Sequence, residues 1–308
     1  MAEDFPVRID KRLMRRAFER AADTYDQASP LQREVGQRLL ERLELVRLAP
    51  TLVLDVGCGT GVGSRALAQR YPKARVLGLD IATAMLRVAR LGDPWWRRTF
   101  AGIAGGNVPT YVGGDLEHLP LPESSVQLLC SNLALQWSND LAAAFAEFRR
   151  VLAPGGLLMF STFGPDTLRE LRQAFAGLDG YTHVNRFMDM HDIGDELAYA
   201  GFATPVVDME YITLTYADLM GLLRELKAIG AHNVTSGRGH GLMGKNAWRA
   251  MLGNYEKLRR DGRLPATYEV IYGHAWVNEK MPMSPTTTDD GRQVIQWKIQ
   301  ARQMGLRR

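Results

Sequence analysis

The chain has 308 residues, 46% of them apolar and 23% charged, which is typical of a soluble globular protein with one or two domains. Its net charge of +4 is modest, and no stretch approaches the ~18 uninterrupted apolar residues of a membrane span or resembles a secretory signal. The two cysteines, Cys58 and Cys130, lie in apolar strand-like runs, which excludes a disulfide framework and predicts a cytoplasmic protein.

Helices are expected first, followed by strands and helices that alternate. Apolar residues recur at helical spacing over 11–27 and again over 31–46, where Ser29-Pro30 is a start signal. Strands are then predicted at 51–57, 74–80, 110–115, 126–132 and 157–164, with helices at 62–70, around 84–89 and at 140–152 between them. This alternation predicts an α/β fold, in which helices cover both faces of a parallel sheet.

The second half of the chain is less regular. The predicted elements are a helical segment at 165–200, a strand at 205–216, a helix-rich insertion at about 217–262 and a last strand at 268–277. The remaining residues are polar and rich in Pro, Thr and Asp, so we expect them to be flexible. Three parts are therefore predicted: an N-terminal helical cap (1–48), an α/β domain with a helical insertion (49–277) and a tail (278–308).

Three glycines follow the first predicted strand. Gly57, Gly59 and Gly61 stand behind Asp55 in the pattern D-x-G-x-G-x-G. This is not the G-x-G-x-x-G of dinucleotide-binding proteins, and no Gly-Lys-Ser/Thr follows, so a phosphate-binding loop is not predicted. Alternating glycines instead allow the backbone to lie flat against a ligand that has no phosphate to bind.

Polar side chains are predicted at the ends of four strands, where open α/β sheets hold their ligands. Asp55 suits an ammonium group, Asp80 suits two ribose hydroxyls, and Asp115 suits the exocyclic amine of adenine. Asn132 ends the fourth strand. Together they outline S-adenosylmethionine. The alternative, a glycine turn among scattered surface acids, does not predict an acid at the end of the second strand.

The stretches "VLDVGCGTG", "GDLEHLPLPESSVQLLCSNLALQW" and "RRVLAPGGLLMFSTFG" closely resemble the class I S-adenosylmethionine-dependent methyltransferases. The resemblance covers roughly residues 50–165. It implies a Rossmann-like fold with a mainly parallel seven-stranded sheet whose last strand is antiparallel, and S-adenosylmethionine as cofactor. These motifs do not specify the methyl acceptor.

The residues after the fourth strand, "SNLALQW", lack the Asn-Pro-Pro-aromatic or Asp-Pro-Pro-aromatic signature of many amino methyltransferases, which disfavours nucleic-acid bases as acceptors. An anionic acceptor such as a carboxylate needs no catalytic base, only cations and donors that position it. The candidates are Arg186, our first choice, with Lys227, His232, Asn233 and Tyr268. Taken singly, each of them is better explained by ordinary surface or helix polarity, because Lys and Arg are mostly exposed in any case. The six histidines show no metal-ligand spacing, so no metal is predicted.

Further stretches over most of residues 15–277, among them "HVNRFMDMHDIGDEL", "LTYADLMGLLRELKAIGAHN" and "GRLPATYEVIYGHAW", look like the malonyl-[acyl-carrier protein] O-methyltransferases of biotin synthesis. This narrower resemblance implies methylation of the free malonyl carboxylate on an acyl carrier protein or on malonyl-CoA. It also implies that Tyr25 and the N-terminal helices fold over the cofactor, and that the insertion at 217–262 closes over the acyl chain.

Arginine pairs such as Arg149-Arg150 and Arg259-Arg260 fit either solvated helix faces or a surface for an acidic partner, and an acyl carrier protein is acidic. Two other functions stay open: methylation of a free small carboxylic acid, and a non-catalytic, cofactor-binding assembly factor of the same fold. Arginines around the pocket mouth would favour the carrier protein. The stretch "WWRRTFAGIAGG" (95–106) has no role that we can assign.

Overall fold

The computed structural model describes residues 8–92, 107–231, 233–236 and 243–279, and the backbone of 286–287 and 293–294. The stretch at 95–106 therefore lies outside the described residues. The chain divides into two compact units, Met1–Asn278 and Glu279–Arg308. The second unit contains the short antiparallel pair β8 (Thr286–Thr287) and β9 (Gln293–Val294).

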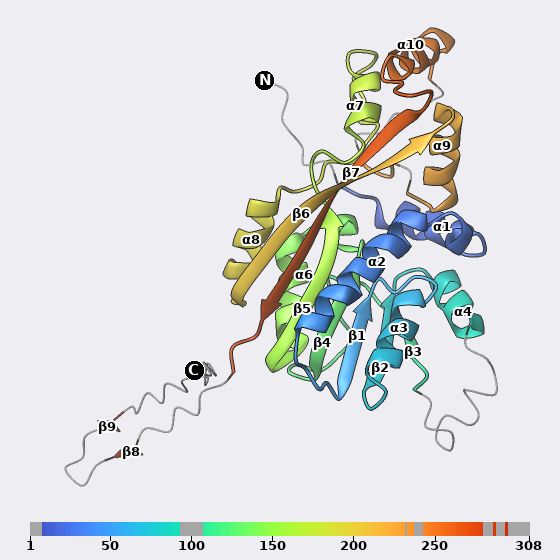
Figure 1. Ribbon diagram of the computed structural model, residues 1–308. Coiled ribbons are helices and arrows are strands. Elements are labelled where there is room, and N and C mark those ends of the chain that lie inside the picture. The colour runs from blue at the N-terminus through green and yellow to red at the C-terminus, as the bar shows by residue number, and fades with distance from the viewer. Residues whose placement is uncertain are drawn as a thin grey trace, which may run out of the picture. The chain divides into compact units, whose positions relative to one another are not determined.

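The first unit is built on a seven-stranded sheet (Figure 1). Its strands are β1 (Leu52–Val56), β2 (Arg75–Asp80), β3 (Thr110–Gly113), β4 (Val126–Asn132), β5 (Leu152–Phe163), β6 (Ala203–Tyr216) and β7 (Leu264–Trp276). They lie in the order β3-β2-β1-β4-β5-β7-β6. The strand β7 is antiparallel to both of its neighbours, and the other pairs are parallel. The predicted fold class is confirmed.

Helices cover both faces of this sheet. They are α1 (Lys11–Ala21), α2 (Pro30–Arg42), α3 (Val62–Arg70), α4 (Thr83–Gly92), α6 (Leu141–Val151), α7 (Arg169–Phe175), α8 (Met190–Tyr199), α9 (Leu219–Ala228) and α10 (Lys245–Glu256). Short 3₁₀ turns lie at Tyr25–Gln27, Leu43–Leu45 and Leu135–Trp137. None of the helices in the described part of the chain combines the length and apolar composition needed to span a bilayer.

The central strands are buried on both faces because each face has its own apolar layer. Val53 of β1 packs in one cluster with Val35 of α2 and Leu67 of α3, while the next residue, Leu54, packs in the other cluster with Phe145 of α6. Alternation of successive side chains across the sheet places both layers against a single strand. This is why the sequence of β1 is a continuous apolar run.

The segment expected to be helical over 165–200 differs in the structure. Only α7 and α8 are helical, and residues 176–189 between them form a loop. Gly177 follows α7 with a φ of 75°, a left-handed conformation in which a right-handed helix cannot continue. The loop that results contributes to the wall of the cavity described next.

Candidate functional site

A cavity of about 970 Å³ lies at the carboxyl ends of the parallel strands. One section of it is polar and is formed by strand ends and the glycine loop, with Gly57, Gly59, Asp80, Asp115 and Asn132 in its wall. The other section is largely apolar and is formed by β5, α7 with the loop that follows it, and α9. Its wall contains Phe163, Phe175, Phe187, Leu223 and Leu226. The helix α1 contributes to the cover of the cavity through Met14 and Phe18. The cavity therefore has room for two different ligand groups.

The glycines of the loop after β1 serve different purposes. All three adopt positive φ, at 73° for Gly57, 54° for Gly59 and 79° for Gly61. A Cβ at Gly57 would lie 2.3 Å from the Ala134 Cβ, so close packing requires glycine there. A Cβ at Gly59 would meet nothing within 4 Å, and Gly59 lines the cavity. The open side of Gly59 fits a ligand that lies flat against the backbone, as predicted for S-adenosylmethionine.

Backbone N–H groups fix the carboxylate of Asp80 in the cavity wall. Its carboxylate accepts the N–H of Gly59 at 2.9 Å and the N–H of Ala82 at 2.8 Å. Burial raises the pKa of Asp80, and these hydrogen bonds oppose the rise. Tyr25 lines the same section, and burial together with Asp80 raises its pKa. Its hydroxyl therefore keeps its proton and can donate a hydrogen bond.

Asp55 lies behind the glycine loop rather than in the cavity wall. Its side chain is 5% exposed and accepts a hydrogen bond from the Ser64 hydroxyl of α3 at 2.6 Å. Burial raises the pKa of Asp55 to about 6, although the bond from Ser64 opposes the rise. Gly61 caps the same helix. The direct contact between Asp55 and an ammonium group stays a prediction.

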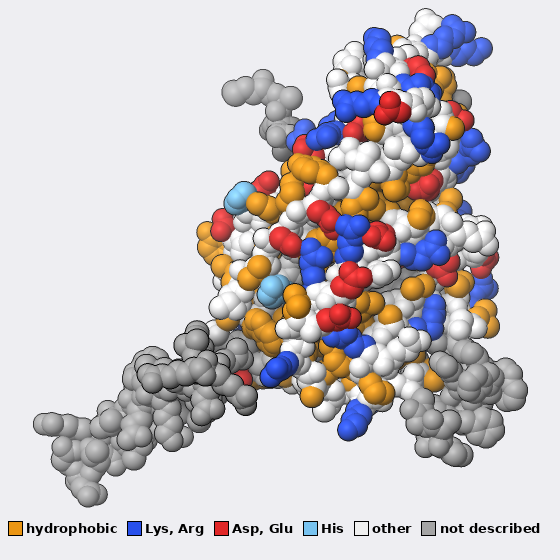
Figure 2. Space-filling model, in the orientation of Figure 1, with side chains coloured by type: hydrophobic (Ala, Val, Ile, Leu, Met, Phe, Trp, Pro, Cys, Tyr) orange, Lys and Arg blue, Asp and Glu red, His pale blue; other side chains and the backbone are white. Residues whose placement is uncertain are grey.

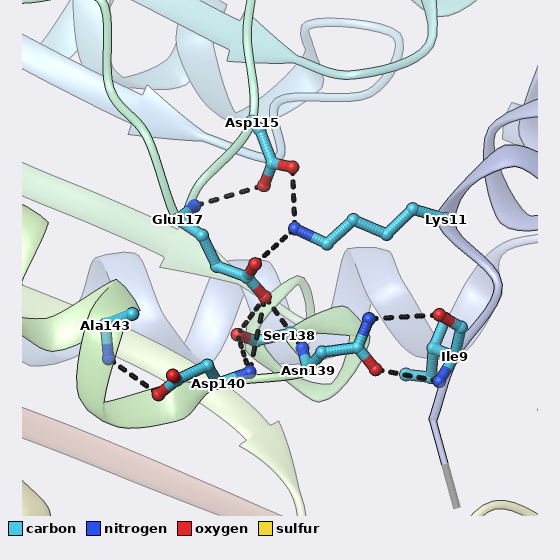
Figure 3. Close-up of polar contacts among 8 residues, drawn as sticks. All are labelled: Ile9, Lys11, Asp115, Glu117, Ser138, Asn139, Asp140 and Ala143. Atoms are coloured by element: carbon cyan, nitrogen blue, oxygen red, sulfur yellow. Dashed lines mark hydrogen bonds and ion pairs between the residues drawn. The ribbon is translucent and has the colours of Figure 1, made fainter.

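Asp115 is engaged by a cation that the sequence did not indicate (Figure 3). Its Oδ2 atom is 2.6 Å from the Nζ atom of Lys11 in α1, and its Oδ1 atom accepts the N–H of Glu117 at 3.1 Å. Lys11 also lies 2.5 Å from Glu117 Oε2. Burial acts to lower the pKa of Lys11, but the hydrogen bonds to the two carboxylates outweigh it and raise the pKa. Asp115, the residue predicted to bind adenine, is thus paired with the charged side chain of Lys11.

Asn132 joins the end of β4 to the N-terminal region. Its amide nitrogen donates to the carbonyl of Gln32 in α2 at 2.9 Å, and its Oδ1 atom accepts the Ser161 hydroxyl at 2.7 Å. Asn132 also lines the cavity. Its side chain therefore ties α2 to the polar section of the cavity.

The structure separates the residues predicted to bind substrate. Lys227, Asn233 and Tyr268 line the cavity, Lys227 as an exposed cation and Tyr268 with only 4% of its surface exposed. Arg186 lines a second pocket of about 140 Å³, on the other side of Phe187 and Gln136, which line both spaces. His232 lies outside the described residues.

Asn233 is occupied by its own neighbourhood. Its amide nitrogen donates to the Thr182 carbonyl, and its Oδ1 atom accepts the backbone N–H of Thr235 at 2.9 Å and the Thr235 hydroxyl at 2.6 Å. The residue thereby ties the segment after α9 to the loop after α7. Both segments are walls of the apolar section.

Several polar residues of the cavity wall were missed from the sequence. Arg20 of α1 and Arg224 of α9 line it, as does His183, whose ring stacks on Phe175 at a centroid distance of 3.8 Å and whose Nε2 atom lies 2.9 Å from Asp179. The helical spacing around Arg20 and Arg224 indicated helices but not which face would meet the cavity. Within the described ranges, no three His, Cys, Asp or Glu residues gather as a metal site would require.

Comparison with known proteins agrees with this geometry. Residues 54–160 match the family model described as "Methyltransferase domain". The chain is 58% identical over 287 residues to the malonyl-[acyl-carrier protein] O-methyltransferase of Gallionella capsiferriformans, an alignment that covers 93% of this chain and 96% of that protein. It is 57% identical to the protein of the same name from Nitrosospira multiformis, with 93% and 95% covered.

Among solved structures, the YcgJ protein of Bacillus subtilis is similar in fold, with a TM-score of 0.53 and 15% identity over 79% of this chain and 99% of that one. A likeness at this identity concerns the fold alone. The sequence relatives are far more similar to this chain, and their alignments cover more than nine-tenths of both chains. The chain belongs to the malonyl-[acyl-carrier protein] O-methyltransferases, a family of S-adenosylmethionine-dependent methyltransferases.

Proposed function

We propose that this enzyme transfers the methyl group of S-adenosylmethionine to the free carboxylate of a malonyl thioester on acyl carrier protein. The product is the malonyl methyl ester with which pimeloyl and biotin synthesis begins. The observation that carries the proposal is a single cavity that joins an open glycine loop to an apolar section beneath α9. The identity to relatives that bear this name supports the choice of acceptor.

The cofactor section is formed by Gly57, Gly59, Asp80 and Tyr25, with Asp115 at its far end. S-adenosylmethionine, when bound, supplies an electrophilic methyl group. The malonyl carboxyl group is ionised near neutral pH because carboxyl pKa values are about 4, so no residue of the chain has to remove a proton. The protein's task is to align the carboxylate and to exclude water. We assign no catalytic base or acid.

The acceptor is positioned by the wall opposite the glycine loop. We propose that Lys227 is the cation that binds the malonyl carboxylate and that Tyr268 is a buried hydrogen-bond donor to it, because both line the cavity. Asn233 acts by shaping the wall, since its amide is bonded to Thr182 and Thr235. Arg186 and His232 stay predictions from the sequence. Neither of the two cysteines forms a disulfide, which fits the proposed cytoplasmic location.

The carrier protein docks on the helical insertion. Residues 217–262 contain eight Lys and Arg but only four Asp and Glu. Figure 2 shows blue side chains gathered at the top of the view, where α7, α9 and α10 lie in Figure 1. The exposed cations of α9, α10 and the turn after α10 are Arg224, Lys227, Lys245, Arg249, Lys257 and Arg260. Such a surface complements an acidic carrier, whereas malonyl-CoA offers only its own phosphates.

Intact-mass spectrometry of the carrier tests the function directly. The purified enzyme is incubated with S-adenosylmethionine and either malonyl-loaded or acetyl-loaded carrier protein. We expect the malonyl carrier to gain the mass of one methylene and the acetyl carrier to stay unchanged, since it has no free carboxylate. If calorimetry shows cofactor binding but neither carrier changes, methylation of a free acid or a non-catalytic role would replace this proposal.

A further inference from the structure

The N-terminal segment of the described chain is bonded to the segment that follows α9. Ile9 and Thr235 form an antiparallel β-bridge, the Asp10 N–H donates to the Val234 carbonyl at 3.0 Å, and the Ser236 N–H donates to the Arg8 carbonyl at 2.8 Å. The Ser236 hydroxyl also accepts the N–H of Arg8 at 3.1 Å. These two segments are more than 220 residues apart in the sequence, yet they form one short ladder.

The same N-terminal segment is anchored to the cofactor section (Figure 3). The side chain of Asn139 makes two bonds to the Ile9 backbone: its Oδ1 atom accepts the N–H at 2.7 Å and its Nδ2 atom donates to the carbonyl at 3.0 Å. Two residues further on, Lys11 reaches Asp115 and Glu117. Glu117 in turn accepts the N–H of Asn139 at 2.7 Å. Residues 8–11, which we name the clasp, thus contact the cofactor section on one side and the segment after α9 on the other.

A second contact joins α1 to the end of α9. Gly230 follows α9 with a φ of 73°, and a Cβ at this position would lie 3.2 Å from the backbone of Ala17 in α1. The backbone of α1 therefore packs directly on the turn that ends α9. We name α9 with residues 229–231 and 233–236 the lid. The lid lines the apolar section of the cavity through residues such as Leu223 and Leu226.

We propose that the clasp and the lid move as one unit, so that S-adenosylmethionine bound at the glycine loop stabilises the closed lid over the acceptor. The clasp cannot move away from the cofactor section unless the ladder at Thr235 breaks or the lid moves with it. By thermodynamic linkage, an acceptor held under the lid stabilises the bound cofactor by the same factor. The inference rests on the proposed function only in taking the ligand of the glycine loop to be the cofactor.

Hydrogen exchange with S-adenosylhomocysteine as the probe tests this coupling, because it does not depend on methyl transfer. In the wild type, saturating probe is expected to slow exchange of the α9 amides by about fivefold or more, the lower end of ordinary coupling between sites. Ser236→Pro removes the Ser236 N–H and the hydroxyl that bind Arg8, and Ser236 lines neither cavity section. In this variant the probe should still protect α1 but should protect α9 less than in the wild type, because only the Asp10–Val234 bond and the packing of Gly230 on Ala17 remain.

Arg15→Met is the matched control, because Arg15 is a cation of α1 whose ion pair, with Glu19 at 2.9 Å, lies within the helix. It should keep the wild-type protection of α9. Ser236→Ala replaces the proline variant if that variant folds poorly. It removes only the hydroxyl, so its protection of α9 should lie between those of the wild type and Ser236→Pro. Protection of α9 that is undiminished in Ser236→Pro, or that is absent in the wild type with probe bound, overturns the coupling. A wild type that does not bind the probe in calorimetry would instead contradict the proposed function.

Discussion

Asp55 shows at the level of a single residue how a buried carboxyl group behind the glycine loop affects stability. Burial raises its pKa to about 6, whereas an unfolded aspartate titrates near 3.8. The folded chain therefore binds this proton more tightly than the unfolded chain, and ionisation of Asp55 destabilises the fold increasingly as the pH rises from about 4 to 6. The cost is complete above pH 6 and absent below pH 4.

Asp55→Asn should therefore become more stable relative to the wild type as the pH rises from 4 to 7. The expected change in the difference between their free energies of unfolding is on the order of 2 kcal/mol, from the shift in pKa. Urea unfolding of the ligand-free proteins at both pH values measures it. Asp23→Asn, at a highly exposed aspartate, should show no such trend. A pH-independent difference for Asp55→Asn would mean that Asp55 is not ionised at a cost.

Gly57 and Gly59 permit a comparison in which the backbone strain is shared. Both have positive φ, so alanine costs about 1–2 kcal/mol at either position. Gly57→Ala adds a clash with Ala134 and should lower the free energy of unfolding well beyond that amount. Gly59→Ala adds no clash but places a methyl group in the cavity, so calorimetry should show at least tenfold weaker binding of S-adenosylhomocysteine. Unchanged binding by Gly59→Ala would contradict the proposed position of the cofactor.

At the level of elements, the sequence predicted most strands and helices because a buried parallel sheet imposes a pattern that can be recognised. The bounds of β4 agree with the prediction, and those of α3 do too. The loop between α7 and α8 was missed because the end of α7 depends on the left-handed backbone of Gly177. A glycine in a sequence does not reveal which φ it adopts. The position of this loop in the cavity wall depends in turn on tertiary bonds such as that from Asn233 to Thr182.

The attachment of α1 rests on Lys11, whose side chain is 25% exposed and lies between Asp115 and Glu117. Lys11→Met leaves two partly buried carboxylates without their cation and should destabilise the protein by about 1–2 kcal/mol, between the values for exposed and buried pairs. Adding Glu117→Gln should restore part of that loss, because it removes one of the facing charges. Thermal unfolding of the two single variants and the double variant measures the coupling, and strictly additive effects would argue against the ion pair.

Across the whole molecule, the sequence could indicate which strand-end residues line the cavity but not which side chains from other elements they contact. Parallel strands bring their carboxyl ends to one edge, and this placed Asp80, Asp115 and Asn132 in the cavity wall. Lys11 was missed because it lies 104 positions from Asp115 in the sequence and reaches it only through the packing of α1. Arg186, predicted from its neighbours in sequence, lines the smaller pocket because the loop after α7 directs it there.

The charge of the insertion leads to a test of carrier docking that involves the whole molecule. Lys245 and Arg249 are exposed and four residues apart, so they share one face of α10. Reversing both to Glu should raise the KM for malonyl-loaded carrier protein about tenfold, equivalent to about 1.4 kcal/mol, and weaken its dependence on salt. The KM for malonyl-pantetheine should stay near the wild-type value, because that substrate has the reacting group without the carrier surface.

Lys73→Glu, an exposed charge reversal in the turn between α3 and β2, is the control for net charge alone. That turn lies at the amino ends of the strands, away from the carboxyl ends that hold the cavity, so its reversal should leave both KM values unchanged. If Lys73→Glu raises the KM for the carrier as much as the pair on α10 does, attraction is spread over the whole chain. If the α10 variant instead impairs both substrates equally, its cations act on the malonyl group, and the carrier must be recognised by another surface.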